Sequence, residues 1–256
     1  MGGTLARYSA EGVRTVVVTC TRGDLGEVLD TSLMGQDVGT IRDQELRAAA
    51  DALGVRRLVQ LGYLDSGMAG EVANLRPGAF HIADVSEAAA RLLDIMREER
   101  PQVVVTYDET GGYGHPDHIK AHQVTLAALG ACPEKVRPKR LYFIRYPMSW
   151  TREFVAALRR EGIDAPASAA TGADAGPHVR EIGVADDQVT TEVDVRAFID
   201  RKLAAVACYR SQWPAEHFIR RMPRELGERL WALEYYSRAD AVAGNRSETD
   251  LFTDLD

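Results

Sequence analysis

Two histidines and an aspartate, His115, Asp117 and His118, stand within four consecutive positions of the sequence. Neutral imidazole and carboxylate are common zinc ligands, and imidazole also carries protons near neutral pH. Histidines three positions apart can face the same side of a first helical turn. The pattern therefore favours a catalytic site in which one histidine binds a metal and the other acts as an acid or base. A capped helix start with solvated histidines is the structural alternative.

The elements around these residues place them at the end of a strand. Residues 102–107 form a short apolar run rich in β-branched residues, and residues 119–129 continue as a predicted helix. The Gly-Gly-Tyr-Gly loop between them allows a tight turn, and Pro116 suits the first turn of a helix. In open α/β sheets, ligands bind at the carboxyl ends of strands, where this loop would lie. A dinucleotide-binding loop fits poorly, because Asp117 stands where the third glycine of that fingerprint belongs.

Acidic residues follow two further predicted strands. Residues 14–20 predict a buried strand, after which Asp24 and Glu27 lie in a polar loop. Residues 55–63 predict the next strand, and Asp65 follows its tip. Because the carboxyl ends of parallel strands share one edge of a sheet, these three carboxylates are candidate site residues. Ordinary loop charge is the alternative for Asp24 and Glu27.

Arg42 is a candidate binding residue on a predicted helix. We expect this helix to begin at Thr40 as its cap and to run to about Leu53, where Gly54 stops it. Arg42 lies in the first turn of that helix, where a cation opposes the helix dipole. Either the side chain has a purpose other than helix stability, or it is simply solvated.

Strands alternate with helices along the chain, which predicts an α/β fold. We expect one Rossmann-like domain over residues 1–256, with a mostly parallel sheet and helices on both faces. Residues 162–178 have little to bury and predict a flexible insertion, and residues 247–256 predict a loosely held acidic tail. The remaining expected helices are 2–12, 84–99, 150–161, 194–209 and 224–236, and the remaining expected strands are 140–146 and 189–195.

The composition narrows the classes of partner. With 31 basic and 38 acidic residues, the formal charge is −7, and no basic block could neutralise a run of phosphates. Nucleic acid is therefore excluded as a partner. The three cysteines, Cys20, Cys132 and Cys208, suggest no disulfide framework and predict a reducing cytoplasm. No apolar run approaches about 18 residues, so no membrane span is expected. The predicted partner is a small molecule. The sequence does not decide whether the protein forms a homo-oligomer.

The histidine segment also carries a family resemblance. Residues 112–118, Gly-Tyr-Gly-His-Pro-Asp-His, resemble the zinc-dependent N-acetylglucosaminyl deacetylases of the PIG-L or LmbE-like family. Within that family the sequence looks most like the mycothiol enzymes, namely the deacetylase of N-acetylglucosaminyl-inositol and the amidase of mycothiol conjugates. The supporting stretches are residues 17–21, 26–27, 64–68, 105–108 and 248–252.

The resemblance implies a role for each candidate residue. His118 would bind zinc, and His115 would stabilise the oxyanion or protonate the leaving amine. The implied reaction is zinc-assisted hydrolysis of the N-acetyl amide of an N-acetylglucosaminyl substrate linked to inositol. The other implied roles are Asp117 orienting the histidines, Tyr113 closing over the acetyl carbonyl, Arg42 and Asp65 holding sugar or inositol hydroxyls, and Glu27 lining the pocket.

One family motif is absent from this sequence. Members of the family place a first strand and a His-Pro-Asp-Asp motif ahead of the helix that here begins at Gly2. The resemblance therefore predicts that Met1 is an internal methionine and that the 256 residues alone bind zinc weakly. A parallel sheet without that strand would keep an apolar gap and unpaired backbone groups. The alternatives are a mycothiol S-conjugate amidase and a non-catalytic sugar- or thiol-binding protein that has lost the metal.

Overall fold

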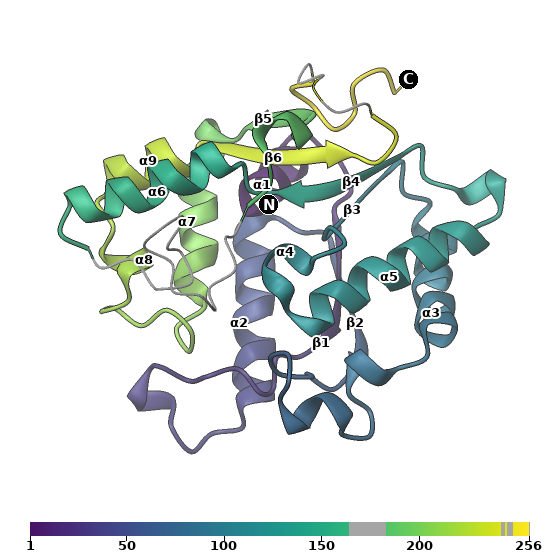
Figure 1. Cartoon of the computed structure of the whole chain (residues 1–256), viewed down its shortest axis with the longest axis horizontal. Helices are drawn as coiled ribbons and strands as arrows, with labels where there is room; N and C mark the ends of the chain where they lie inside the picture. Colours follow the sequence, from purple (N-terminus) through teal and green to yellow (C-terminus); the bar gives the residue numbers. More distant parts are fainter. Residues whose placement is uncertain (164–182, 242–243, 245–247, 256) are drawn as a thin grey trace.

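Figure 1 shows a computed structural model of the chain, which describes residues 1–163, 183–241, 244 and 248–255. Strands occupy the centre, and helices pack around them. The strands are β1 Val16–Thr21, β2 Arg57–Tyr63, β3 Val103–Thr106, β4 Arg140–Arg145, β5 Thr191–Asp194 and β6 Leu233–Arg238. The helices are α1 Gly2–Ala10, α2 Val38–Leu53, α3 Val85–Glu99, α4 Gly111–Gly114, α5 Pro116–Ala131, α6 Met148–Arg160, α7 Ile199–Cys208, α8 Phe218–Arg221 and α9 Arg224–Trp231.

The described strands form two separate sheets. β1 pairs with β2 in parallel, and the second sheet has the order β3-β4-β6-β5. In the second sheet β3 and β4 are parallel, whereas β6 runs antiparallel to β4 and β5. The α/β class is confirmed, but two sheets, one of them mixed, replace the predicted single and mostly parallel sheet. Helix α5 packs against both β1 and β3, so the break between the two sheets lies between these strands.

Helices cover both faces of the β1–β2 sheet. On one face, Val18 and Cys20 of β1 pack in a cluster with Leu93 of α3 and Val124 of α5. On the other face, Val17 borders a cavity whose wall also includes residues of α2. Alternate residues of a strand point to opposite faces, so the continuous apolar run of β1 requires cover on both sides.

Aspartates fix the starts of the two helices that flank this sheet. The backbone N–H of Thr40 donates to Asp37 Oδ1 at 2.8 Å, so α2 begins at Val38, before the predicted cap at Thr40. Asp84 caps α3 as predicted by accepting from the Glu87 N–H at 2.9 Å. Each aspartate satisfies a backbone donor that a first helical turn leaves free. Arg42 consequently lies in the second turn of α2 rather than the first.

Residues 233–238 form a strand rather than the end of a helix. We expected one helix over residues 224–236, but α9 ends at Trp231 and β6 follows it. β6 lies between β4 and β5, and Tyr236 in its middle is fully buried. Aromatic residues fit a buried strand well, and hydrogen bonding to two neighbouring strands outweighs the helical spacing of the apolar residues.

The acidic C-terminal segment is packed rather than loose. Leu251 is buried, and its backbone N–H donates to the Tyr8 hydroxyl of α1 at 2.8 Å. Asp250 accepts from the Tyr8 hydroxyl at 2.9 Å and from Arg7 at 2.8 Å. The prediction of a loose tail is therefore wrong for residues 248–255. The predicted insertion lies outside the described residues from residue 164 onward.

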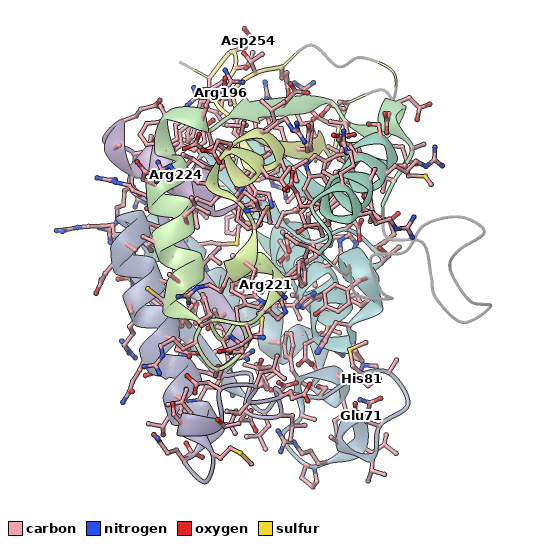
Figure 2. The ribbon with its side chains drawn as sticks, turned by 90° about the vertical axis from the view of Figure 1, so that its left-hand side faces the viewer. Glu71, His81, Arg196, Arg221, Arg224 and Asp254 are labelled. Atoms are coloured by element: carbon pink, nitrogen blue, oxygen red, sulfur yellow. The ribbon has the colours of Figure 1, made fainter. Side chains whose placement is uncertain are left out.

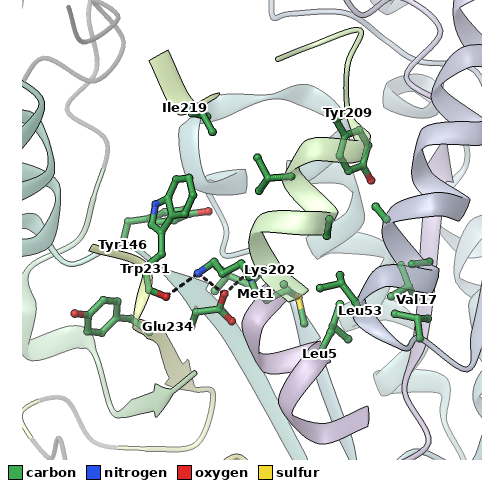
Figure 3. Close-up of a pocket in the computed structure, with 18 of the residues that line it drawn as sticks. Met1, Leu5, Val17, Leu53, Tyr146, Lys202, Tyr209, Ile219, Trp231 and Glu234 are labelled. Carbon is green, nitrogen blue, oxygen red and sulfur yellow. Dashed lines mark hydrogen bonds and ion pairs between the residues drawn. The ribbon is translucent and has the colours of Figure 1, made fainter. Parts of the chain in front are cut away.

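A cavity of about 440 Å³ lies along the break between the sheets. Its wall includes Val17 of β1 and Ile144 of β4, together with apolar side chains of α1, α2 and α7. Figure 3 shows Lys202 and Glu234 at this cavity, where the ammonium lies 2.7 Å from the carboxylate. Among the described residues that line the cavity, none belongs to the predicted histidine site.

Charged side chains lie at both ends of the molecule. Figure 2 shows Arg196 and Asp254 at one end, and Glu71 and His81 at the other. Glu71 and His81 belong to the long connection from β2 to α3. Within the part of the chain that the structure describes, no helix has the length and apolar character needed to cross a membrane.

Candidate active site

The histidine turn, residues 108–118, links β3 to α5 through the short helix α4. Gly111 and Gly112 have φ angles of 66° and 79°, which residues other than glycine rarely adopt. The backbone at Gly111 passes so close to α5 that an added Cβ atom would lie 2.7 Å from the His118 Cβ atom. Glycine at this position therefore allows the turn to lie directly against the helix that carries His118.

His115 is the N-cap of α5. The backbone N–H of Asp117 donates to His115 Nδ1 at 3.2 Å. A ring nitrogen that accepts a hydrogen bond carries no proton, so the neutral ring holds its proton on Nε2. His115 can therefore donate a hydrogen bond from Nε2 to a substrate atom.

His118 has the opposite tautomer. Its Nδ1 lies 3.1 Å from the carbonyl oxygen of Gly111. Because a carbonyl oxygen can only accept, Nδ1 carries the proton and Nε2 keeps a free lone pair. Burial, followed by the charge of His115, lowers the pKa of His118 to about 4, so the ring is neutral near pH 7. A neutral imidazole with a free Nε2 lone pair is the form that binds a metal.

Two tyrosines enclose the His118 ring. Tyr107 stacks on it, with ring centroids 4.0 Å apart and 8° between the ring planes. Tyr113 meets His118 edge-on, with centroids 5.1 Å apart, and lies 6.1 Å from the His115 ring. The two histidine rings are themselves 4.9 Å apart. The structure therefore brings together the three aromatic site residues that the sequence predicted, with Tyr107 against one face of His118.

Asp117 and Asp65 bring two carboxylates to this cluster. Asp117 is 6% exposed; its Oδ2 accepts from the Ser66 N–H at 3.1 Å, whereas its buried Oδ1 has no hydrogen-bond partner among the described residues. One ligand atom from each of Asp65, His115 and Asp117 lies within 4.8 Å of the other two. Burial raises the pKa of Asp117, and the charge of Asp65 adds to this. A cation or a hydrogen-bond donor placed among these groups would lower that electrostatic cost.

Arg42 reaches the same region from α2. It packs so closely on the loop after β1 that a Cβ atom at Gly26 would lie 2.8 Å from Arg42 Nη1. That Nη1 is buried without a hydrogen-bond partner in the described residues. Burial lowers the pKa of Arg42, and the charges of several neighbours, Asp65 and Tyr113 among them, oppose that shift. Arg42 is therefore close enough to Asp65 and Tyr113 to interact with them electrostatically, and their shared role in binding stays a prediction.

Asp24 holds Asp65 in place. Asp24 Oδ1 accepts from the Asp65 backbone N–H at 3.0 Å, and Asp24 Oδ2 lies 2.6 Å from Arg76 Nη2. Arg76 also donates to the Asp65 carbonyl oxygen at 2.7 Å. Glu27, by contrast, is exposed, and in the described residues no hydrogen bond or ion pair joins it to this group. Its predicted place in the pocket stays a prediction.

Three further residues support the histidine turn and were not selected from the sequence: Tyr107, Asp108 and Arg145. Asp108 had a local signal, because an aspartate often accepts from the backbone N–H two residues later. Arg145 had none, since it pairs with Asp108 across 37 residues. The stacking of Tyr107 depends on how the strand meets the helix, which only the folded structure shows.

Comparison with known proteins identifies the family. The sequence profile described as PIG-L, GlcNAc-PI de-N-acetylase, matches residues 1–129, about half of the chain. The chain belongs to the PIG-L family. A 1D-myo-inositol 2-acetamido-2-deoxy-alpha-D-glucopyranoside deacetylase from Acidothermus cellulolyticus is 43% identical, over 100% of this chain and 90% of that protein. A protein of the same name from Thermobispora bispora is 40% identical, over 96% of this chain and 85% of that protein. The predicted family is thereby confirmed.

Solved structures share the fold of this PIG-L member. The N,N'-diacetylchitobiose deacetylase from Pyrococcus horikoshii matches with a TM-score of 0.55 and 22% identity, over 100% of this chain and 80% of that one. The 4-carboxy-2-hydroxymuconate hydratase GalB from Pseudomonas putida matches with a TM-score of 0.59 and 19% identity, over 94% and 90%. Because these two proteins carry different activities on one fold, function has to be argued from the site.

Proposed function

We propose that the protein hydrolyses the N-acetyl amide of an N-acetylglucosaminyl group linked to inositol. The observation that carries this proposal is the pair of opposite tautomers in the histidine turn. Nε2 of His115 carries a proton, whereas Nε2 of His118 carries a free lone pair. A metal-dependent amide hydrolase needs both a hydrogen-bond donor to the developing oxyanion and a metal ligand. Relatives at 43% and 40% identity are named as deacetylases of such a substrate, which supports this choice.

Zinc is the metal that we propose for the site, with His118 as a ligand. A neutral imidazole is among the usual zinc ligands, and the unpaired Asp117 Oδ1 shows that the buried site also has an unsatisfied carboxylate oxygen. Among the described residues, the ligand atoms that lie within 4.8 Å of one another belong to Asp65, His115 and Asp117, and the His118 ring lies beside that of His115. Carboxylate and imidazole donors of this kind are ones that zinc binds. When bound, zinc polarises an amide carbonyl and acidifies water.

The side chains of the histidine turn contribute to the reaction at the amide. His115 Nε2–H donates a hydrogen bond to the carbonyl oxygen as negative charge develops, while water adds to the carbonyl carbon, the C–N bond breaks and the proton that the water releases passes to the leaving amine. Tyr113 is half-exposed at the rim of the cluster, where its hydroxyl can close over the acetyl carbonyl. Asp117 orients His115 through its backbone N–H, so that Nε2 faces the substrate. A positioned donor of this kind contributes roughly 100- to 10,000-fold to the rate.

Arg42 and Asp65 suit the hydroxyl groups of a sugar or inositol. A guanidinium donates to hydroxyl oxygens, and a carboxylate accepts from hydroxyl groups. Arg42 Nη1 is buried without a partner in the described residues, so a substrate hydroxyl there would remove the cost of an unmade hydrogen bond, about 1 to 3 kcal/mol. Removal of one substrate hydroxyl should therefore cost more than lengthening the acyl group.

Alanine variants of the two histidines test the proposed mechanism. His118→Ala should lose zinc affinity, whereas His115→Ala should keep the metal and lose roughly 100- to 10,000-fold in turnover. Zinc affinity by chelator competition and amine release with excess zinc are the measurements. His81→Ala is the control, because this histidine side chain is exposed. Equal zinc affinity in the wild type and His118→Ala would reject His118 as the ligand.

A comparison of substrates tests the choice of reaction. We expect N-acetylglucosaminyl-inositol to have a higher kcat/KM than a mycothiol S-conjugate at matched concentrations. Preference for the conjugate would make the protein a conjugate amidase. Binding of the inositol glycoside without amine release would instead favour a sugar-binding protein, a second candidate supported by the unpaired Arg42 Nη1 atom.

A further inference from the structure

Asp108 is a buried carboxylate at the start of the histidine turn, and it does not touch the proposed substrate site. Asp108 is 3% exposed. Asp108 Oδ1 accepts three hydrogen bonds: from the Thr110 N–H at 2.9 Å, the Thr110 hydroxyl at 2.7 Å and the Gly112 N–H at 3.0 Å. One oxygen atom therefore fixes the backbone on both sides of Gly111.

The other carboxylate oxygen connects the turn to the mixed sheet. Asp108 Oδ2 lies 2.6 Å from Nη1 of Arg145, the last residue of β4. Arg145 Nε in turn donates to the Ser237 hydroxyl of β6 at 2.9 Å, and its guanidinium lies over the Phe143 ring. Contacts with residues of β4 and β6 therefore orient the Arg145 side chain that pairs with Asp108.

Gly111, between the atoms that Asp108 holds, determines the tautomer of His118. Its carbonyl oxygen faces His118 Nδ1 at 3.1 Å. Tyr107 cannot make this choice, because it stacks on the face of the imidazole and both tautomers present the same face. The direction of the Gly111 carbonyl is set by the left-handed turn at Gly111 and Gly112, which is the part of the backbone that Asp108 binds.

We propose that Asp108, supported by Arg145, is a positioning residue that holds His118 in the Nδ1–H tautomer. The series of contacts runs from Ser237 through Arg145 and Asp108 to the Gly111 carbonyl and then to the His118 ring. This inference rests on the proposed function only for the use of the Nε2 lone pair as a zinc ligand. Groups that orient a metal-binding histidine typically contribute 10- to 100-fold to metal affinity.

The main test is imidazole nitrogen NMR on the full chain without metal, at one fixed pH above neutrality. The wild type should show His118 protonated at Nδ1. Asp108→Ala should lose this single tautomer, because the Gly111 carbonyl is no longer held in direction. Asp108→Asn keeps an acceptor oxygen for the backbone N–H groups and should retain Nδ1–H to a greater extent than Asp108→Ala.

Zinc affinity by chelator competition is the second measurement. Asp108→Ala should bind zinc about 10- to 100-fold more weakly than the wild type, and Asp108→Asn should be affected less. Glu248→Gln is the control for loss of a carboxylate that pairs with an arginine, because Glu248 pairs with Arg238 and accepts from the Thr191 hydroxyl away from the turn. It should leave the His118 tautomer and the zinc affinity unchanged.

The two proposals fail in different ways. An unchanged His118 tautomer and unchanged zinc affinity in Asp108→Ala would overturn the positioning role and leave amide hydrolysis standing. If Asp108→Ala does not fold, the same two measurements on Asp108→Asn decide. This variant loses the charge that pairs with Arg145, so a partial loss of the Nδ1–H tautomer and of zinc affinity is expected, and wild-type values in both would overturn the role. A wild type that binds zinc but releases no amine would overturn the proposed reaction while leaving the tautomer result intact.

Discussion

The histidine turn and the recognition loops, residues 22–30 and 64–76, meet at one site but are held by different kinds of contact. In the turn, Asp108, His115 and His118 each have a hydrogen bond that spans at most seven residues. Single contacts from Arg145 to Asp108 and from Ser66 to Asp117 join the turn to distant segments. In the recognition loops, Asp24 reaches Asp65 across 41 residues and Arg76 across 52. The proposed chemistry therefore depends mostly on local backbone geometry, and the proposed substrate binding depends on the packing of distant segments.

This difference has a physical reason. Hydrogen-bond donation to a substrate and metal binding require ring nitrogens that are positioned to within a fraction of an ångström. Short hydrogen-bonded turns provide such precise positions. Loops that bind a polyol can be held by fewer contacts, because several hydroxyl groups share the binding energy. Changes in the turn should therefore affect stability and turnover, whereas changes in the loops should affect KM.

The largest expected effect is that of Gly111→Ala. A side chain there would need a left-handed φ and would place Cβ 2.7 Å from His118 Cβ and 2.8 Å from the Ile119 nitrogen. We expect the free energy of unfolding to fall by about 2 to 4 kcal/mol. Gly35→Ala is the control, because φ is 84° but nothing lies within 4 Å of the added atom, so the loss should be about 1 kcal/mol. Urea unfolding measures both, and equal losses would contradict the comparison.

An intermediate effect is expected for Arg76→Ala in the recognition loops. The variant loses the contacts of Arg76 with Asp24 and with the Asp65 carbonyl oxygen. The substrate-binding free energy should weaken by about 1 to 2 kcal/mol, which corresponds to a KM roughly 5- to 30-fold higher, with kcat within twofold of the wild type. Arg97→Ala, which removes an exposed pair with Asp94 on α3, should leave KM unchanged. A fall in kcat without a change in KM would show that these loops also set the chemistry.

The smallest effect is expected at the amino ends of β1 and β2, which are the ends far from the site. Glu99 pairs there with Arg14 and Arg57, and these hydrogen bonds lower the pKa of Glu99 to about 2. Because the pKa is lowered on folding, the stabilisation exists above pH 4.5 and is lost as the pH falls towards about 2. Glu99→Gln should lower Tm at pH 7 by about 1 to 3 °C, and this difference should shrink over that range.

The control for this pair is the neighbouring residue. Glu98 also lies within 2.7 Å of Arg57 but is 61% exposed, so Glu98→Gln should change Tm less than Glu99→Gln does. Calorimetric scans at several pH values provide the measurement. A change in kcat or KM in Glu99→Gln would show that contacts at the amino ends of the strands reach the site.

The sequence predicted the local parts of this molecule better than the distant ones. The strand-turn-helix order around His115 and His118, the Asp84 cap and the central strands follow from local pattern and turn chemistry. The strand at Leu233–Arg238 does not, because its pairing with β4 and β5 overrides a helical pattern. The same holds in the site, where Arg42 and Asp65 could be proposed but the supporting pairs with Arg76 and Arg145 could not. Such pairs join segments whose proximity only the tertiary fold determines.

The contacts between α1 and the C-terminal segment have a consequence for how the protein is made. Tyr8 leaves the ribosome early, yet its hydroxyl partner Asp250 lies 242 residues further along. Closing so long a loop carries an entropic cost that must be met before the contact contributes, and such non-local contacts slow folding. During synthesis, α1 can form as a helix but cannot complete its native packing until Asp250 has been made, so this helix is among the last elements to be fixed in place.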